Sequence, residues 1–189
     1  MTTRLTLPNI LTGSRIALVP ALFWALSLGG TQGFLVALLI AILAELTDLL
    51  DGAIARRFNQ QSEFGAQFDP LADSLYRIGA FTALAAFDLI PVWTIIVFAW
   101  RDVLVSYARL MMQAKGRAVG ARLSGKLKAI VQGVAIIALL AMPLVPADIF
   151  DPEMASRAAQ GAFWVALAVT AWSGIDYLLA GARPASGQA

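Results

Sequence analysis

The chain has 189 residues, of which 59% are hydrophobic and only 14% are charged, and its formal net charge is +2. That composition is too apolar for a soluble domain, and the chain is too long for a single membrane anchor. Cysteine and histidine are both absent, which excludes disulfides, thiol nucleophiles, imidazole bases and histidine-ligated zinc. Any proton abstraction must therefore fall to a carboxylate, a lysine or a tyrosine.

Six apolar runs are each long enough to span a bilayer, which needs about 20 residues. In chain order they are Ile10–Leu28, Phe34–Ala55, Asp69–Leu89, Pro91–Met112, Leu127–Leu144 and Ala158–Leu179. Breaks between them fall at Gly29-Gly30, Asn59–Gly65, Ile90-Pro91, Lys115–Lys126 and Pro143–Glu153. The sequence predicts an all-α integral membrane protein with six transmembrane helices.

The ends of the chain are predicted to differ from the spans. Thr2–Asn9 is expected to lie along the membrane surface as a short amphipathic segment. Residues 183–189 are small and polar, and we predict a disordered tail there. Residues 1–182 then form a single membrane domain, because no internal repeat or linker divides them.

The distribution of charge predicts an orientation in the membrane. In a six-span topology one side carries nearly all the cations, namely Arg4, Arg15, Arg56, Arg57, Lys115, Arg117, Arg122, Lys126, Lys128 and Arg183. The opposite loops carry Asp88, Asp148, Asp151 and Glu153, with Arg157 as their only cation. By the positive-inside rule both termini are cytoplasmic.

Four aspartates lie near the cytoplasmic ends of the second and third apolar runs. Asp48 and Asp51 are i,i+3 neighbours, and Asp69 and Asp73 are i,i+4 neighbours, so each pair shares one helix face. Four converging carboxylates in a poorly solvated place repel one another unless cations hold them. Oxygen-only ligands select a hard divalent ion. The pattern therefore predicts a site for Mg²⁺ or Mn²⁺ that opens toward the cytosol.

Other charged residues lie inside the apolar runs. Glu45 and Arg77 share the faces of the aspartates, and both a structural ion pair and a substrate role remain open for them. Arg101, beside Asp102, lies within the fourth run, too deep for a simple bias of surface charge. A pocket for a phosphorylated acceptor explains such a cation, because arginine binds phosphate bidentately. Attraction to anionic lipid headgroups is the alternative for the basic segment as a whole.

The stretch from Asp48 to Asp73 has the pattern D-x2-D-G-x2-A-R-x8-G-x3-D-x3-D. It resembles the motif of the CDP-alcohol phosphotransferases (CDP-alcohol phosphatidyltransferases), integral membrane enzymes that make phospholipids, and all eight fixed positions are present. The resemblance implies metal-dependent transfer of a phosphatidyl group from CDP-diacylglycerol to an alcohol, with release of CMP. It implies that Asp48, Asp51, Asp69 and Asp73 bind one or two ions, and that Asp73 is also the catalytic base.

The resemblance also implies substrate contacts. The CDP-lipid would be contacted by Asn9, Thr12, Gly52, Arg56 and Ser62. The acceptor alcohol, polar and phosphorylated, would be contacted by Arg77, Arg101, Arg109, Lys126 and Lys128. The expected partners are the membrane lipids and a second copy of the chain, which would form a homodimer. No binding to nucleic acid is expected. In a bacterial cell the protein would lie in the inner membrane.

The identity of the acceptor stays open at this stage. The patterns Pro8-Asn9…Thr12…Arg15 and Arg101-Asp102…Arg109…Lys126-Leu127-Lys128 resemble the branch of the family that makes phosphatidylglycerophosphate from glycerol 3-phosphate. That branch usually has lysine after the last motif aspartate, where this chain has Ser74. Phosphatidylglycerol, as in a cardiolipin synthase, and inositol or inositol phosphate are alternatives. A transporter with an acidic ion site is the rival class, which would need charges across the whole membrane thickness.

Overall fold

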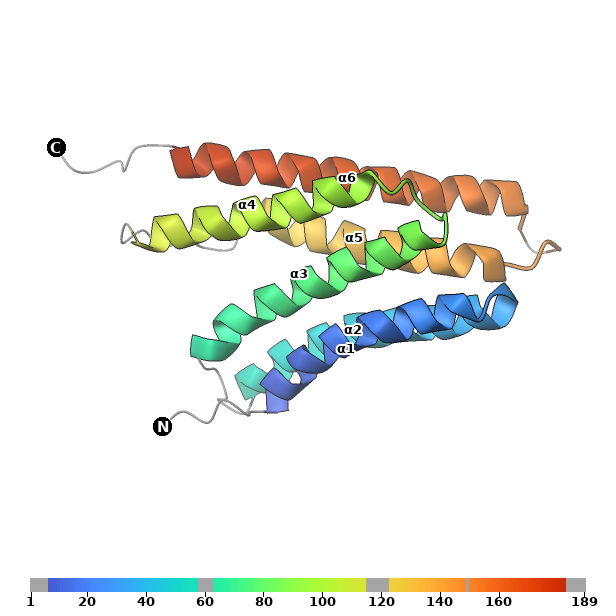
Figure 1. Ribbon diagram of the computed structural model, residues 1–189, viewed down its shortest axis with the longest axis horizontal. Helices are drawn as coiled ribbons and strands as arrows, with labels where there is room; N and C mark the ends of the chain where they lie inside the picture. The colour runs from blue at the N-terminus through green and yellow to red at the C-terminus, as the bar shows by residue number, and fades with distance from the viewer. Residues whose placement is uncertain (1–6, 58–62, 115–122, 149, 183–189) are drawn as a thin grey trace.

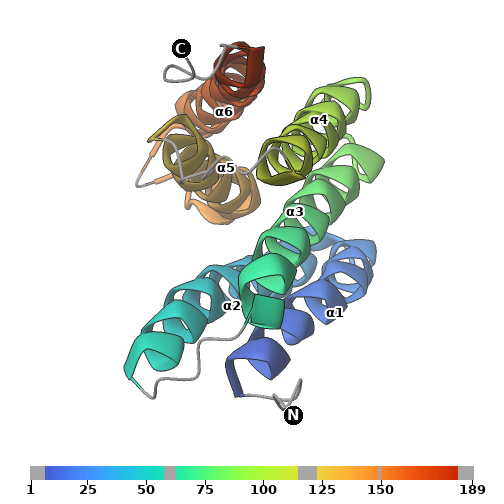
Figure 2. The same cartoon turned by 90° about the vertical axis from the view of Figure 1, so that its left-hand side faces the viewer.

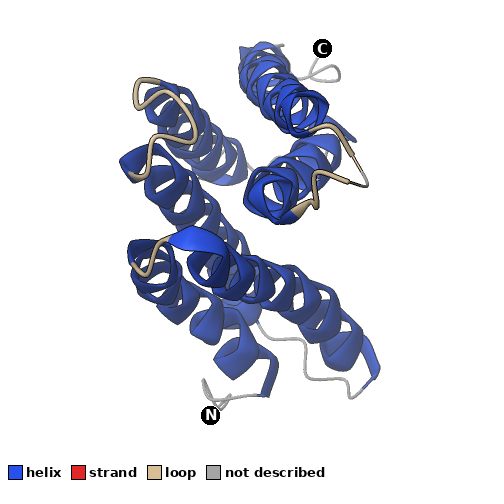
Figure 3. Cartoon of the chain, turned by 90° about the vertical axis from the view of Figure 1, so that its right-hand side faces the viewer, coloured by secondary structure: helices blue, strands red, loops and turns tan. Residues whose placement is uncertain are grey.

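A computed structural model describes residues 7–57, 63–114, 123–148 and 150–182 of the chain. These residues form α1 (Leu7–Ser27), α2 (Gly30–Arg57), α3 (Glu63–Ala86), α4 (Thr94–Ala114), α5 (Leu123–Ala141), the 3₁₀ turn η1 (Met142–Leu144) and α6 (Pro152–Ala182). The described ranges contain no strand (Figure 3), which confirms the all-α prediction for them. Most of the predicted amphipathic segment and the whole predicted tail lie outside these ranges.

The six helices lie alongside one another and connect alternately at the two ends of a bundle (Figure 1). α1 packs against α2 and α3, and α6 packs against α4 and α5. α3 and α2 join the two groups through their contacts with α4 and α5 (Figure 2). Because the number of helices in the described part is even, the beginning of α1 and the end of α6 lie at the same end of the bundle.

The interior of the bundle combines alanines with large buried side chains such as Phe81 and Phe163, and many large apolar side chains also cover its outside. Ala37, Ala41 and Ala44 form one face of α2 and are completely buried. The outward face of the same helix carries Leu39, which is 57% exposed, with Leu35, Leu43 and Leu46 at about half. Small residues let helices approach closely in lipid. A continuous exposed apolar face of this kind suits hydrocarbon rather than water.

Four of the helices are long and apolar enough to cross a membrane, over Asn9–Ser27, Gly30–Asp48, Leu123–Leu144 and Pro152–Ala180. α3 and α4 have 24 and 21 residues, which is long enough for the hydrocarbon core. Their charged residues, three of them within the predicted span on each helix, lower their hydropathy. The described residues thus contain four candidate membrane-spanning helices, consistent with a membrane protein, and the six-span arrangement remains a prediction.

All six predicted starts differ by three to six residues from the starts of the helices, and two boundaries have a clear local cause. α3 ends at Ala86 rather than Leu89, because Asp88 adopts a left-handed conformation with φ 59°, a common way to stop a helix. α6 begins at Pro152, inside the predicted break Pro143–Glu153. The Asp151 carboxylate accepts a 3.0 Å hydrogen bond from the Glu153 amide and so caps the helix. The break at Gly29-Gly30 is where it was predicted, and both glycines have positive φ.

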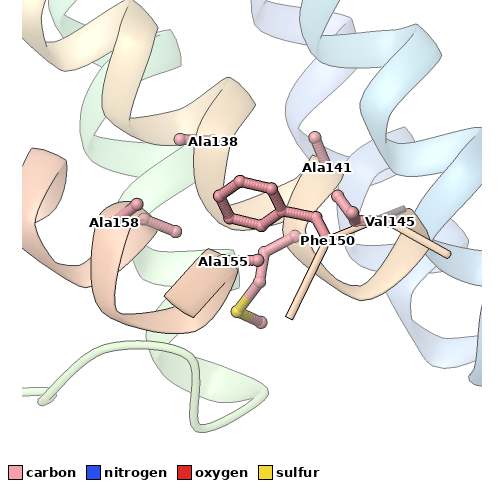
Figure 4. A pocket seen from close by; sticks show the side chains of 8 residues that line it. Ala138, Ala141, Val145, Phe150, Ala155 and Ala158 are labelled. Atoms are coloured by element: carbon pink, nitrogen blue, oxygen red, sulfur yellow. The ribbon is translucent and has the colours of Figure 1, made fainter. Parts of the chain in front are cut away.

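An apolar cavity of about 440 Å³ lies where α5 ends and α6 begins (Figure 4). It is lined by alanines together with Met142, Val145 and Phe150. None of its lining residues can carry a charge or transfer a proton. The polar chemistry described below belongs to helix segments at the opposite end of the bundle (Figure 1).

Candidate active site

Three of the four predicted aspartates meet around one guanidinium group. Arg15 Nη1 on α1 lies 2.7 Å from Asp48 Oδ1 on α2 and 3.9 Å from Asp73 Oδ1 on α3. Arg15 Nη2 lies 3.7 Å from Asp69 Oδ1, also on α3. Three helices therefore bring one cation and three carboxylates together. Asp51 lies one turn beyond Asp48 on α2, but the side chains of residues 49–64 are outside the description.

Burial within this acid cluster, defined as Asp48, Asp69 and Asp73, is unequal. The Arg15 side chain is only 1% exposed, whereas the three carboxylates are 38%, 50% and 26% exposed. Arg15 thus lies buried beneath the cluster, and the three carboxylates are accessible to solvent. A substrate or an ion from the solvent would reach the carboxylates first.

The acid cluster offers only oxygen donors, which suits a hard divalent ion. Within the described residues no three acidic side chains are arranged as a finished metal centre, and the cation they share is Arg15. Asp48, Asp69 and Asp73 could hold Mg²⁺ or Mn²⁺ if the guanidinium moves aside. The donor set therefore fits the predicted metal, whose presence remains a prediction.

Arg15 was not among the predicted site residues. Its sequence signal was available, because it lies inside the first apolar run, as Arg101 lies inside the fourth. Asn9 and Thr12, which were predicted to contact the nucleotide, are also buried on α1, at 8% and 4% exposure. Asn9 lies six residues and Thr12 three residues before Arg15, so all three residues are on nearby parts of one helix. The role of Asn9 and Thr12 remains a prediction.

The other predicted CDP contacts cannot be placed as side chains. Gly52 and Arg56 belong to the last turns of α2, within the range whose side chains are not described. Ser62 lies outside the described residues altogether. For these three residues the sequence-based prediction stands untested.

Arg77 connects the acid cluster to a further carboxylate. Its Nε donates to Asp73 Oδ1 at 3.1 Å. Its Nη1 and Nη2 donate to the two oxygens of Glu45 on α2 at 3.0 and 3.1 Å. Such a forked pair fixes both partners in direction as well as distance. These donors bind protein carboxylates in the structure, and the predicted contact of Arg77 with the acceptor remains a prediction.

A glycine on α5 makes room for this pair. A Cβ at Gly133 would lie 2.9 to 3.0 Å from the Glu45 carboxylate atoms, closer than side chains tolerate. α5 can therefore approach α2 at this point only because residue 133 has no side chain. The Glu45–Arg77–Asp73 chain is in this way supported by three helices.

A second polar cluster joins α4, α5 and α6. Arg101 Nη1 and Lys128 Nζ both donate to Asp102 Oδ1, at 2.9 and 2.8 Å. Arg101 Nη2 donates to Ser173 Oγ at 2.7 Å, and Arg109 Nη2 donates to Tyr177 Oη at 2.7 Å. This basic cluster, defined as Arg101, Arg109 and Lys128, contains three of the predicted acceptor residues.

Lys126, predicted with them, is exposed on α5 and belongs to a different face of the helix. Tyr177, Ser173 and the Ser124–Asp176 hydrogen bond of 2.6 Å were not predicted. A signal for the α6 residues existed, because Asp176 is a lone charge within the last apolar run. The sequence does not show against which helices α6 packs.

The two clusters lie at the same end of the bundle. The acid cluster occupies the second half of α2 and the first half of α3, with Arg15 on the first half of α1 beside it. The basic cluster occupies the second half of α4 and the beginning of α5. These segments, together with the end of α6, lie at one end in Figure 1. An apolar helical bundle thus carries a cluster of carboxylates and a cluster of cationic side chains at the same end.

Comparison with known proteins identifies the class. The chain belongs to the CDP-alcohol phosphatidyltransferase family, whose model matches residues 5–172. Together with the four apolar helices, this membership indicates an integral membrane protein.

Individual relatives differ in how much of the chain they match. The chain is 36% identical to a CDP-diacylglycerol–glycerol-3-phosphate 3-phosphatidyltransferase of Bacillus subtilis, over 90% of this chain and 92% of the relative. It is 34% identical to a probable phosphatidylglycerophosphate synthase of Mycobacterium tuberculosis, over 96% of this chain and 84% of the relative. It is 38% identical to a cardiolipin synthase (CMP-forming) of Streptomyces coelicolor, but over 53% of this chain and 48% of the relative.

Proposed function

We propose that this protein transfers the phosphatidyl group of CDP-diacylglycerol to glycerol 3-phosphate, giving phosphatidylglycerophosphate and CMP. The observation that carries the proposal is the placement of the acid cluster and the basic cluster at one end of the bundle. Two negatively charged substrates can then meet between them. The choice of glycerol 3-phosphate is supported by relatives named for that reaction, which match at least 90% of this chain.

In the proposed reaction Asp73 takes the proton of the acceptor hydroxyl. The hydroxyl oxygen then forms a new bond to the phosphatidyl phosphorus, while the bond from that phosphorus to the CMP oxygen breaks. Arg77 holds the Asp73 carboxylate in one orientation through its 3.1 Å hydrogen bond, and Arg77 is itself held by Glu45. One or two Mg²⁺ or Mn²⁺ ions on Asp48, Asp51, Asp69 and Asp73 would neutralise the donor diphosphate and the departing CMP.

The remaining residues bind the two substrates in this proposal. Asn9, Thr12, Gly52, Arg56 and Ser62 contact the CDP portion, with Arg56 on its phosphates. Arg101, Arg109 and Lys128 attract the phosphate of the acceptor, and Asp102 keeps two of these cations oriented through hydrogen bonds of 2.8 and 2.9 Å. Arginine suits this task because its planar donors match phosphate oxygens.

The most informative test of the proposal is CMP release from CDP-diacylglycerol by the purified protein. Glycerol 3-phosphate, phosphatidylglycerol, inositol phosphate, inositol and serine are offered separately, each with Mg²⁺ or Mn²⁺ and each with a chelator. We expect CMP with glycerol 3-phosphate and a divalent ion, and none with the chelator. Release with phosphatidylglycerol instead would assign the chain to cardiolipin synthesis. A transporter would release no CMP with any acceptor, and that result would overturn the proposal.

Replacing Arg101 with alanine tests the acceptor pocket. The substitution removes a buried cation, so we expect the KM for glycerol 3-phosphate to rise about tenfold or more, as for the loss of a charged hydrogen bond. The KM for CDP-diacylglycerol should change little. Arg157→Ala is the control, because Arg157 is exposed and pairs with Glu153 far from both clusters. An equal rise in both KM values would argue against the pocket.

We also propose that α3 and α4 span the membrane, that both termini and the active site face the cytoplasm, and that the protein is a homodimer. The cationic segments near the site support the orientation.

Since the chain has no cysteine, single cysteines can be introduced to test the orientation. Gln113 and Asp148 are exposed near opposite ends of the bundle, so a cysteine at each position can be labelled from one side of the membrane. An impermeant reagent added outside intact cells should label only Asp148→Cys; labelling of Gln113→Cys would reverse the orientation. Light scattering of the purified protein tests the dimer.

A further inference from the structure

One tyrosine ring serves both arginines of the basic cluster. Tyr177 on α6 is completely buried, and its hydroxyl accepts the 2.7 Å hydrogen bond from Arg109 Nη2. The guanidinium carbons of Arg101 and Arg109 lie 5.6 and 5.0 Å from the centre of its ring. These arginines are eight residues apart on α4, or about 12 Å along the helix axis. The same ring therefore contacts two cations that lie well apart along α4.

The two arginines still have donors to offer. Within the described residues, Arg101 Nε and Arg109 Nε are buried and have no hydrogen-bond partner. Arg101 is 9% exposed as a whole residue, and its Nη1 and Nη2 already donate to Asp102 and Ser173. Buried donors without partners are rare in folded proteins. Two such donors belong to the cations beside this ring, so neither guanidinium group is fully satisfied by the described residues.

The position of the tyrosine depends on a glycine of α5. A Cβ at Gly125 would lie 3.2 Å from Tyr177 Oη and 3.7 Å from Arg101 Nη2. A side chain at residue 125 would therefore crowd the hydroxyl, which would have to shift by a few tenths of an ångström. α4, α5 and α6 all contribute to the placement of this one hydroxyl group.

We propose that Tyr177 is a positioning residue that holds Arg101 and Arg109 against one ring, and that it thereby strengthens the binding of the phosphate group of glycerol 3-phosphate. The inference rests on the proposed function for the identity of the acceptor. The ring attracts both guanidinium groups through its face, and the hydroxyl anchors Arg109. Without the hydroxyl, Arg109 is no longer tied to α6, and the phosphate loses one of its two arginine partners.

The test compares Tyr177→Phe with Tyr107→Phe in the full-length protein purified in detergent. Tyr107 is the matched control, because it lies on α4 but is 64% exposed. Calorimetry measures the Kd for glycerol 3-phosphate, and for inorganic phosphate as a probe of the phosphate group alone. For Tyr177→Phe we expect both Kd values to rise about tenfold, together with the KM for glycerol 3-phosphate. The KM for CDP-diacylglycerol and the kcat should stay within twofold, and Tyr107→Phe should match the wild type.

Binding is measured without turnover, so failure of the inference differs from failure of the proposed function. A wild-type protein that binds glycerol 3-phosphate but releases no CMP would refute the function, and the Kd values would still decide the role of Tyr177. Unchanged Kd values in Tyr177→Phe, no binding by the wild type, or an equal loss of CDP-diacylglycerol binding would each overturn the inference. If Tyr177→Phe does not fold, the second variant is Gly125→Ala, which crowds the hydroxyl. Gly125→Ala should then bind glycerol 3-phosphate more weakly than the wild type. If Gly125→Ala bound glycerol 3-phosphate as tightly as the wild type, the inference would be overturned.

Discussion

Replacing Asp73 with asparagine should abolish phosphatidyl transfer while binding of CDP-diacylglycerol largely survives. Asparagine has nearly the same shape as aspartate, and its amide oxygen can still accept the hydrogen bond that Arg77 Nε makes at 3.1 Å. It cannot take a proton from the acceptor hydroxyl. Loss of a general base costs about 10²–10⁴ in rate, so we expect kcat to fall by roughly a thousandfold or more. CMP release measures kcat, and retention of labelled CDP-diacylglycerol measures binding.

The control for this variant is Asp148→Asn, an exposed aspartate beyond η1. It changes the charge of the chain by the same amount without touching the acid cluster, and should turn over like the wild type. A kcat for Asp73→Asn within tenfold of the wild type would show that another group accepts the proton. Loss of CDP-diacylglycerol binding in step with turnover would show that Asp73 acts mainly in holding the donor.

Replacing Arg15 with glutamine should make the stability of the protein depend strongly on divalent ions. Arg15 is the cation that Asp48, Asp69 and Asp73 share, so its removal takes away a positive charge that all three carboxylates face, although Asp73 keeps its hydrogen bond from Arg77. Breaking a fully buried pair costs about 3–5 kcal/mol, and partial exposure of these carboxylates reduces this to roughly 2 kcal/mol. In a chelator the Tm should therefore fall by about 5 °C. Mg²⁺ should restore most of the loss, because it no longer has to displace a guanidinium.

Thermal unfolding in detergent, with Mg²⁺ and with a chelator, measures this effect. Arg157→Gln is the matched control, since Arg157 also pairs with a carboxylate, but with both side chains more than 70% exposed. Its Tm should hardly change in either condition. If Mg²⁺ raised the Tm of Arg15→Gln no more than that of the wild type, the carboxylates would not be a metal site that Arg15 occupies.

Much of this arrangement follows from local rules. Apolar runs of membrane length, interrupted at Gly29-Gly30, predict the first two helices well. The i,i+4 relation of Asp73 and Arg77 predicts that they share a face, and the structure pairs them at 3.1 Å. Arg101 and Asp102 are neighbours in the sequence, and their side chains pair at 2.9 Å. Each of these inferences uses residues close together in the sequence.

What sequence reasoning missed depends on which helices become neighbours. Arg15 reaches the acid cluster because α1 packs against both α2 and α3, and no short-range pattern encodes that packing. Glu45 meets Arg77 across 32 residues of chain, with space made by Gly133 on a third helix. Tyr177 lies 68 residues from Arg109. The helix ends at Ala86 and Pro152 were misplaced because single residues, Asp88 and Asp151, decide them.

The central claim is that the aspartates of α2 and α3 hold a divalent ion. Manganese titration followed by electron paramagnetic resonance tests it directly on the purified, full-length protein. We predict one or two bound Mn²⁺ per chain, displaced by Mg²⁺ and lost when Asp48 and Asp69 are both replaced by asparagine. A wild-type protein that binds no Mn²⁺, or a double variant that binds as much as the wild type, would contradict the claim.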